Sequence, residues 1–475
     1  MAVLFNLPDE LLELILLNLT LKFNVRRVGW KRCLRPRDAY DAEVREALIS
    51  QLNLSNTSKA SKRLRRITLP HLYHTIPTTS VNLLHVLAGD AYLASLVKVA
   101  DLTPLLMPIA SLRQALDITL RRLTLPLYFK SGLQGAIEGA ESHNDRYHNY
   151  GVQVALHMAL LPNLEAILYQ SNNHLNHIVM NIICVTYGEL YSLLKITPGV
   201  LSKLRHLFIY HCDPENPEVH STQSFTFRGL LLPSLELLVG VGISWCQTPN
   251  LPPNLSLPHS NSRLEKVTHF MLYKSEISHI DFESMLVCMP NVQHLRITWG
   301  KFRCFETNFD TMGDSLRRHG HSLRSLILDP MSCLSWRARS TIGIVGSLRN
   351  LEQLQDLTVP QYLLTGNPGL LHFDSDDEME NEPSYLTLQQ TLPSSLRSLF
   401  LVGCQKDEEA QDNEICEIIQ EGGGLTNLRR IQMIRYKPFT REASKYGFRA
   451  VFKADGYVAT LTKRKRRNAS SEATG

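Results

Sequence analysis

One pattern of apolar positions recurs from the middle of the chain to its end. Each copy is a leucine or valine, two further residues, an apolar residue, one residue, and another apolar residue (Gly240 in one copy). The copies begin at Leu164, Leu204, Leu235, Val267, Val292, Leu323, Leu354, Leu396 and Leu428, with a weaker copy near Leu96. The final alternation has the period of a β-strand, so each copy predicts one strand.

Helical patterns lie between several of these predicted strands. Segments 152–161, 282–289 and 413–420 have helical spacing, and glycines 422–424 end the last one. Copies start at intervals of about 25–42 residues, which is typical of repeat units with insertions. The arrangement resembles an irregular leucine-rich repeat solenoid, an α/β fold with parallel strands on the concave face and helices on the convex face. A globular α/β domain with coincident leucines is the alternative.

Three further features follow the repeats or interrupt them. Residues 448–453 and 457–462 flank Asp455-Gly456 and predict a hairpin that covers the open edge of the last repeat. The acidic segment 373–382 predicts a disordered loop. Lys463–Arg467 is either a nuclear-import signal or a plain basic tail.

The N-terminal stretch Leu7–Leu19, LPDELLELILLNL, predicts a helix that is apolar on nearly every side. Asp9 and Glu10 lie in its first turn, where the helix dipole favours acidic side chains. Such a helix is buried on more than one face. It either packs as an ordinary core helix or contacts another protein.

A basic stretch follows from Lys22 to Arg37, and residues 38–52 then predict a short amphipathic helix. The basic stretch has three interpretations: a solvated loop, a basic contact surface, or sequence that the native protein does not contain. Together these residues form an insertion at about 21–52.

Residues on both sides of this insertion resemble an F-box. The first half matches at Leu7, Pro8, Glu10, Leu11, Leu12, Ile15 and Leu19, and the second at Leu54, Ser58, Ser61, Lys62, Arg63, Leu64 and Ile67. The sequence departs from the family in its longer connection and in Leu64, where an aromatic residue is common. The resemblance implies a three-helix module that docks on the Skp-family adaptor of a cullin–RING ubiquitin ligase. The implied adaptor-binding residues are Leu7, Pro8, Glu10, Leu11, Leu12, Ile15, Leu19, Leu54 and Leu64.

Composition narrows the compartment and the partners. The chain has 475 residues, is 44% hydrophobic and 20% charged, and carries a formal charge of +5, which does not favour nucleic-acid binding. Its nine cysteines include no CxxC pair, as expected for reduced intracellular thiols. With neither a signal-peptide nor a transmembrane pattern, we expect a cytoplasmic or nuclear protein without a membrane partner.

No catalytic motif is found, and we therefore expect no cofactor, metal or enzymatic activity. P-loop, HExxH and GxSxG patterns are missing, and the pairs His71/His74 and His174/His177 lack further ligands nearby. Function in a repeat array lies on the strand positions between the leucines. Basic residues recur there: Arg205, Arg296, Arg324, Arg397 and Arg429. They are either solubilising charges or a surface for an acidic or phosphorylated ligand.

These patterns predict three parts: a helical F-box-like module at 1–75, a repeat solenoid at 76–436, and a hairpin cap with a basic tail at 437–475. The expected function is that of a non-catalytic substrate receptor, which binds the adaptor, and through it a cullin scaffold, and an unknown target protein. The alternative is a repeat scaffold outside the ligase, whose N-terminal helix caps the array.

Overall fold

The computed structural model describes residues 7–19, 37–77, 81–102, 108–123, 131, 133–135, 137–138, 146–171, 201–211, 232–245, 264–300, 307–330, 343–366, 385–402, 408–420, 425–435, 438–439, 443–453 and 458–463. The chain divides into two compact units, Met1–Val267 (unit 1) and Thr268–Gly475 (unit 2). Within the described ranges, no helix is long and apolar enough to cross a membrane.

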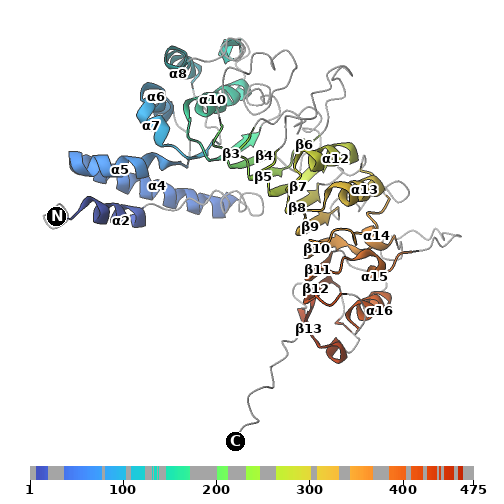
Figure 1. Ribbon diagram of the computed structural model, residues 1–475. Coiled ribbons are helices and arrows are strands. Elements are labelled where there is room, and N and C mark those ends of the chain that lie inside the picture. The colour runs from blue at the N-terminus through green and yellow to red at the C-terminus, as the bar shows by residue number, and fades with distance from the viewer. Residues whose placement is uncertain are drawn as a thin grey trace, which may run out of the picture. The chain divides into compact units, whose positions relative to one another are not determined.

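Unit 1 begins with three helices: α2 (Asp9–Leu19), α4 (Arg37–Ala60) and α5 (Lys62–His74) (Figure 1). The helix predicted within 7–19 is thus confirmed as α2. It packs against both α4 and α5, which also pack against each other. Ser61 separates α4 from α5, because its hydroxyl accepts a hydrogen bond from the Leu64 amide at 3.0 Å and so caps α5.

Helix α4 changes the picture of the predicted insertion at 21–52. The short helix expected at 38–52 is part of a longer one that runs on to Ala60. No glycine or proline interrupts this segment, and the buried Ala47 and Leu54 hold it in the module. The second half of the insertion is therefore folded into the three-helix arrangement, whereas residues 20–36 lie outside the described ranges.

The rest of unit 1 combines a parallel sheet with a helical layer. The strands are β1 (Thr75–Ile76), β2 (Val99–Asp101), β3 (Ala166–Ser171), β4 (His206–His211) and β5 (Leu237–Val241), followed by β6 (Ser244–Trp245). Strands β1 to β5 pair in sequence order, and every pair is parallel. The helices are α6 (Val81–Gly89), α7 (Ala91–Leu96), α8 (Ile109–Arg122) and α10 (Arg146–Leu160), and α6, α8 and α10 share an apolar core.

Unit 2 repeats the same plan more regularly. Its parallel strands are β7 (His269–Ile277), β8 (His294–Trp299), β9 (Ser325–Asp329), β10 (Asp356–Pro360), β11 (Ser398–Val402) and β12 (Arg430–Ile434). Its helices lie on one side of this sheet (Figure 1). They are α12 (His279–Cys288), α13 (Phe309–His319), α14 (Gln361–Thr365), α15 (Leu388–Thr391) and α16 (Glu408–Ile419), with the short 3-10 helix η5 (Ala443–Tyr446) near the end.

The strand predictions are confirmed, because every copy of the apolar pattern runs into a strand from β3 to β12. The weaker copy near Leu96 leads into β2. In and just before β9, the leucines at 323, 326 and 328 are fully buried while the residues between them are not. The result is an open, mostly parallel α/β sheet, consistent with a solenoid-like fold.

The predicted hairpin is also present at the end of unit 2. Strands β13 (Phe448–Lys453) and β14 (Val458–Lys463) pair antiparallel, and β14 pairs antiparallel with β12. The hairpin thereby covers the edge that β12 would otherwise leave open.

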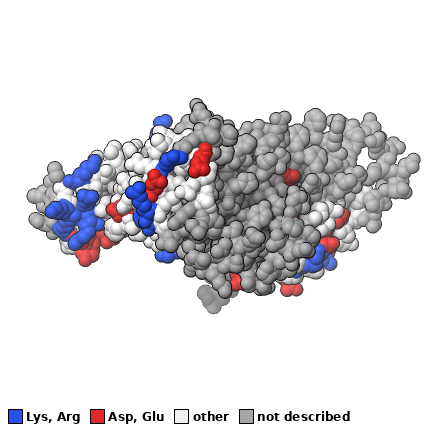
Figure 2. Space-filling view, turned by 90° about the horizontal axis from the view of Figure 1, so that it is seen from above, with Lys and Arg blue, Asp and Glu red and all other residues white. Residues whose placement is uncertain are grey.

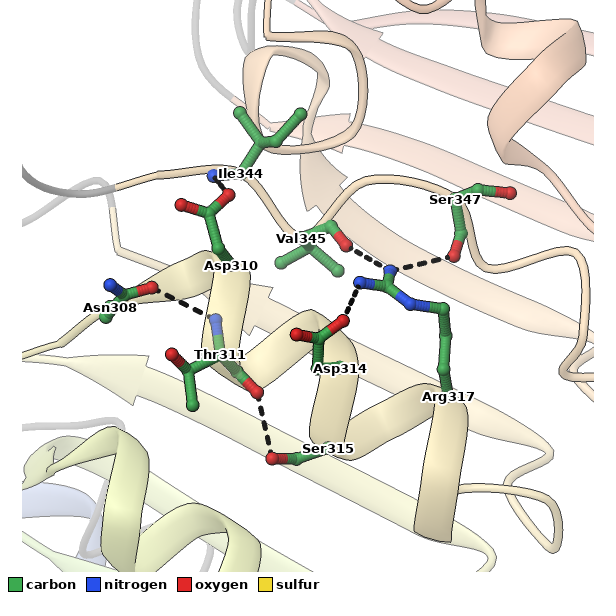
Figure 3. A network of polar contacts seen from close by, with 9 residues as sticks. All are labelled: Asn308, Asp310, Thr311, Asp314, Ser315, Arg317, Ile344, Val345 and Ser347. Atoms are coloured by element: carbon green, nitrogen blue, oxygen red, sulfur yellow. Dashed lines mark hydrogen bonds and ion pairs between the residues drawn. The ribbon is translucent and has the colours of Figure 1, made fainter.

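Helix α13 is fastened to the segment before β10 by polar contacts (Figure 3). The Asp310 carboxylate accepts a hydrogen bond from the Ile344 amide at 2.8 Å, and the Arg317 guanidinium donates to the Val345 carbonyl at 2.7 Å. Gly313 allows this approach, since a Cβ atom there would lie 2.1 Å from the Val345 oxygen.

A buried ion pair joins helix α16 to the residue that follows β12 in unit 2. The guanidinium of Arg435, at the end of β12, donates to the Asp412 carboxylate of α16, and both side chains are inaccessible to solvent. A second contact of 3.3 Å reaches Glu408 on the same helix. Because a buried guanidinium without a partner is strongly destabilising, this pair fixes α16 against the sheet.

Candidate interaction sites

Helix α2 has one face inside the module and one face outside. Leu12 and Leu16 are 2% and 3% exposed, whereas Leu11, Leu14, Ile15 and Leu17 are 46%, 55%, 38% and 47% exposed. The buried pair is four residues apart, as is Leu11 from Ile15, which places each pair on one side of the helix. Large apolar side chains grouped in this way typically mark a contact surface.

The residues expected to bind the adaptor separate into two groups. Pro8, Glu10, Leu11 and Ile15 are at the surface, and Leu7 is half-buried. Leu12, Leu54 and Leu64 instead fill the interior of the three-helix module, so they support the surface without forming it. The side chain of Leu19 lies outside the described set.

Asp9 orients α2 and was not among the predicted site residues. Its carboxylate accepts hydrogen bonds from Arg63 Nε at 2.7 Å and from Arg66 at 2.6 Å, while Arg63 also donates to the Leu7 carbonyl at 2.6 Å. The hydrogen bond from Arg63 is the main cause that lowers the pKa of Asp9. The sequence shows a run of basic residues in α5, which is the signal that could have indicated an acidic partner such as Asp9.

Figure 2 shows Lys and Arg side chains gathered at the end of the molecule that carries the N-terminal helices, next to acidic side chains.

A second group of exposed apolar residues lies on α4, namely Leu48, Ile49 and Leu52. These residues were not among the predicted site residues. They share one helical face by spacing and add apolar area to the surface of the module.

The basic residues predicted on the strands fall mostly on what we call the strand-entry row, the residues immediately before each strand. In unit 1 this row contains Lys98, Glu165, Arg205 and Glu236, joined by successive backbone hydrogen bonds. Lys98 contacts Glu165 at 2.9 Å, and Arg205 contacts Glu236 at 2.7 Å. The hydrogen bond to Glu236 also raises the pKa of Arg205. Opposite charges therefore neutralise the row in unit 1.

The strand-entry row of unit 2 has a different charge pattern. Backbone hydrogen bonds connect its members in the order Gln293, Arg324, Gln355, Arg397, Arg429 and Lys463, the last from the hairpin. Arg324, Arg397, Arg429 and Lys463 are all exposed. Across the described parts of unit 2, none of these four cations contacts a carboxylate within ion-pair distance, and the row itself contains no acidic residue.

Arg296 lies apart from the other predicted basic residues, in the middle of β8. Its guanidinium covers the Tyr273 ring at 4.6 Å, and its buried Nε has no hydrogen-bond partner. Beside it, the rings of His269 and His294 stack at 4.3 Å. Burial, aided by the charge of Arg324, lowers the pKa of His294, so this imidazole is mainly neutral at pH 7.

Several predicted features lie outside the described residues: the connection 20–36, His174 and His177, the acidic segment 373–382, and the tail beyond Lys463. Among the residues that the structure does describe, no three His, Cys, Asp or Glu side chains group closely enough to hold a metal ion. His71 lies 3.9 Å from Glu13, and His74 contacts Thr75.

The geometry thus defines an α/β protein with an open, mostly parallel sheet, an outward apolar helix face and a basic strand-entry row. A scan against models of known protein families finds no match for this chain, and a search of curated proteins finds none.

Proposed function

We propose that the protein is the substrate-recognition subunit of a Skp–cullin–F-box ubiquitin ligase. Its N-terminal helices bind the Skp-family adaptor, and its repeats bind the target protein. The observation that carries the proposal is the outward apolar face of α2, formed by Leu11, Leu14, Ile15 and Leu17 within the stretch that resembles an F-box. The three-helix arrangement of α2, α4 and α5 supports it.

The size of this apolar face suits a stable contact. Full burial of an exposed Leu or Ile is worth about 1.5–3 kcal/mol, and the four side chains are roughly half-exposed. Their complete burial by a partner would contribute several kcal/mol, as in permanent interfaces that resemble a divided core. The contacts of Asp9 with Arg63 and Arg66 hold the helix in place before the partner arrives.

In this role the protein supplies proximity and no reacting group. It holds the target near the transferase that the cullin scaffold carries, which raises the effective concentration of the target lysine. Binding through two separate surfaces is sufficient for that purpose.

The test is co-purification of the full-length protein with a Skp-family adaptor. We expect Ile15→Asp to reduce adaptor capture by about tenfold or more, because it places a charge in the proposed interface. Val86→Asp is the matched control for non-specific apolar binding and retains capture, because Val86 lies on α6, outside the three-helix module, and is 41% exposed against 38% for Ile15. Wild-type protein that fails to capture the adaptor, or an Ile15→Asp variant that still does, contradicts the proposal.

The sequence implies the same adaptor-binding role for Leu12 and Ile15, but the structure distinguishes the two residues. Leu12 is in the interior, so an aspartate there destabilises the three helices themselves. Circular dichroism of the two variants separates loss of contact from loss of fold.

A second candidate is a scaffold that acts outside the ligase, with the N-terminal helices as a cap. It is favoured by the direct passage of α5 into β1, which pairs with β2, and by the hydrogen bond of 2.8 Å from Gln51 Nε2 to the Thr75 carbonyl. The predicted boundary at residue 75 falls inside β1. Deletion of residues 1–75 tests the cap: a cap predicts loss of folding in unit 1, whereas a separate docking module predicts an unchanged melting temperature.

A further inference from the structure

The strand-entry row of unit 2 concentrates positive charge along one edge of the sheet. Arg397, Arg429 and Lys463 precede or end adjacent strands, and Arg324 is two strands further along. Each strand step is about 4.8 Å, so like charges stand close together. Lys463 donates a hydrogen bond to the Thr426 carbonyl at 3.2 Å and lies over the Phe448 ring. The side chains of the three arginines, in contrast, make no hydrogen bond or ion pair among the described residues, unlike the paired charges of unit 1.

The next position along each strand carries no net charge of its own. The register aligns His294, Ser325, Asp356, Ser398, Arg430 and Thr462, of which one is acidic and one is a permanent cation. The hairpin adds the exposed Arg449, opposite Thr462. Asp356 makes no ion pair with Arg324 or Arg397 among the described contacts, so it offsets one charge without neutralising the row.

We propose that this row binds an extended acidic segment of a target protein, whose carboxylates or phosphates pair with Arg324, Arg397 and Arg429. The inference deepens the proposed function and rests on it only for the statement that the bound protein is the target for ubiquitination. Guanidinium groups suit this ligand, because their planar donors pair with carboxylate and phosphate oxygens in a bidentate manner.

Length supports an extended peptide. From Arg324 to Lys463 the row crosses four strand steps, which is about 19 Å at 4.8 Å per step. An extended chain advances about 3.4 Å per residue, so roughly six residues span the row. Acidic side chains at every second position then meet the row at about 7 Å intervals, within reach of flexible arginine side chains.

A nucleic acid fits the row less well. Single strands bind through exposed aromatic side chains on which bases stack, together with a basic track. Neither the row nor the aligned positions beside its arginines (Ser325, Asp356, Ser398 and Arg430) contain an aromatic side chain. The composition of this surface therefore favours the peptide.

The experiment measures binding of fluorescent probes to the full-length protein by anisotropy. The probes are a peptide of about eight residues with alternating Glu and Ser, the same peptide with phosphoserine, a Gln-for-Glu peptide, and a single-stranded RNA of similar length. We expect both acidic peptides to bind, more weakly as salt rises, and the Gln peptide not to bind. Their relative affinity shows whether carboxylates or phosphates are preferred.

The variants locate the site. Arg397→Ala combined with Arg429→Ala is expected to weaken binding of the Glu/Ser peptide about tenfold, since two exposed charge pairs are lost. Arg205→Ala changes an arginine at the same row position in unit 1, where it is already paired, and leaves binding unchanged. Equal melting temperatures of the variants and the wild type establish that folding is retained.

Three results overturn the inference: no binding of either acidic peptide by the wild type, equal loss in Arg205→Ala and in the double variant, or tighter binding of the RNA than of the acidic peptides. None of these depends on adaptor capture. If the protein captures the adaptor but fails the peptide test, the proposed function stands and this inference fails. If it binds the peptide but does not capture the adaptor, the acidic-peptide site stands and the proposed function fails.

Discussion

The two units place charged residues at equivalent positions of the same repeated fold, yet these residues do different things. In unit 1, Arg205 and Glu236 stand on neighbouring strands and form an ion pair. In unit 2, the members next to Arg397 are Gln355 and Arg429, so its charge meets no carboxylate among the described residues. We therefore infer that a basic residue before a strand belongs to the scaffold or to a binding surface according to its neighbour on the next strand.

The interiors of the two units also differ in the ionisable side chains that they bury. Unit 2 buries a charged pair, Arg435 with Asp412, while unit 1 buries His157 in α10, where its Nδ1 contacts the Gln153 carbonyl at 2.8 Å. Complete burial lowers the pKa of His157 to about 4, so this ring is neutral in the folded protein. Removal of a partner and a change of pH thus test different units.

The largest effect is expected for Asp412→Ala in unit 2. The substitution leaves the buried Arg435 guanidinium with the longer contact to Glu408 and the Phe439 ring at 5.7 Å. Because neither replaces the close carboxylate, we expect a loss of about 3–5 kcal/mol of stability. Chemical denaturation of the full-length variant, compared with the wild type, measures this loss. An unchanged unfolding midpoint would show that the pair is not held in the interior.

A smaller effect is expected for pH, and it concerns unit 1. The pKa of His157 is about 4 in the folded protein and near 6.5 when unfolded, so the unfolded state binds the proton more readily. Stability from the neutral ring is complete above pH 6.5 and falls as pH drops towards 4, by about 3 kcal/mol in total. The His157→Gln variant, titrated in parallel, should lack this part of the pH dependence; identical profiles would contradict the assignment.

The sequence predicted the sheet well because alternating leucines leave a local signal. Each predicted strand from β3 to β12 is present, and the hairpin is found where Asp455-Gly456 placed it. Strand β1 was missed because its two residues are too few to show a period. The extent of α4 was missed because the polar residues 55–59 favour a loop locally, and packing of Leu54 inside the module overrides that preference.

The candidate sites were predicted less completely, for a physical reason. Helical periodicity marks Leu12 and Ile15 alike as apolar and does not say which one faces the module. Likewise, the partner of Arg205 is 31 residues away in the chain, and only the register of adjacent strands brings Glu236 beside it. Pairing across repeats is a tertiary property, so the five predicted arginines looked equivalent in the sequence.

The most direct test of this account is the affinity of the Gln355→Glu variant for the Glu/Ser peptide. Gln355 lies between Arg324 and Arg397 in the row, so a glutamate there reproduces the alternating charges of unit 1 with a side chain of nearly equal size. We predict about fivefold weaker binding, an unchanged melting temperature and unchanged adaptor capture. Undiminished peptide binding by this variant would contradict the claim that unpaired charge in the row distinguishes the two units.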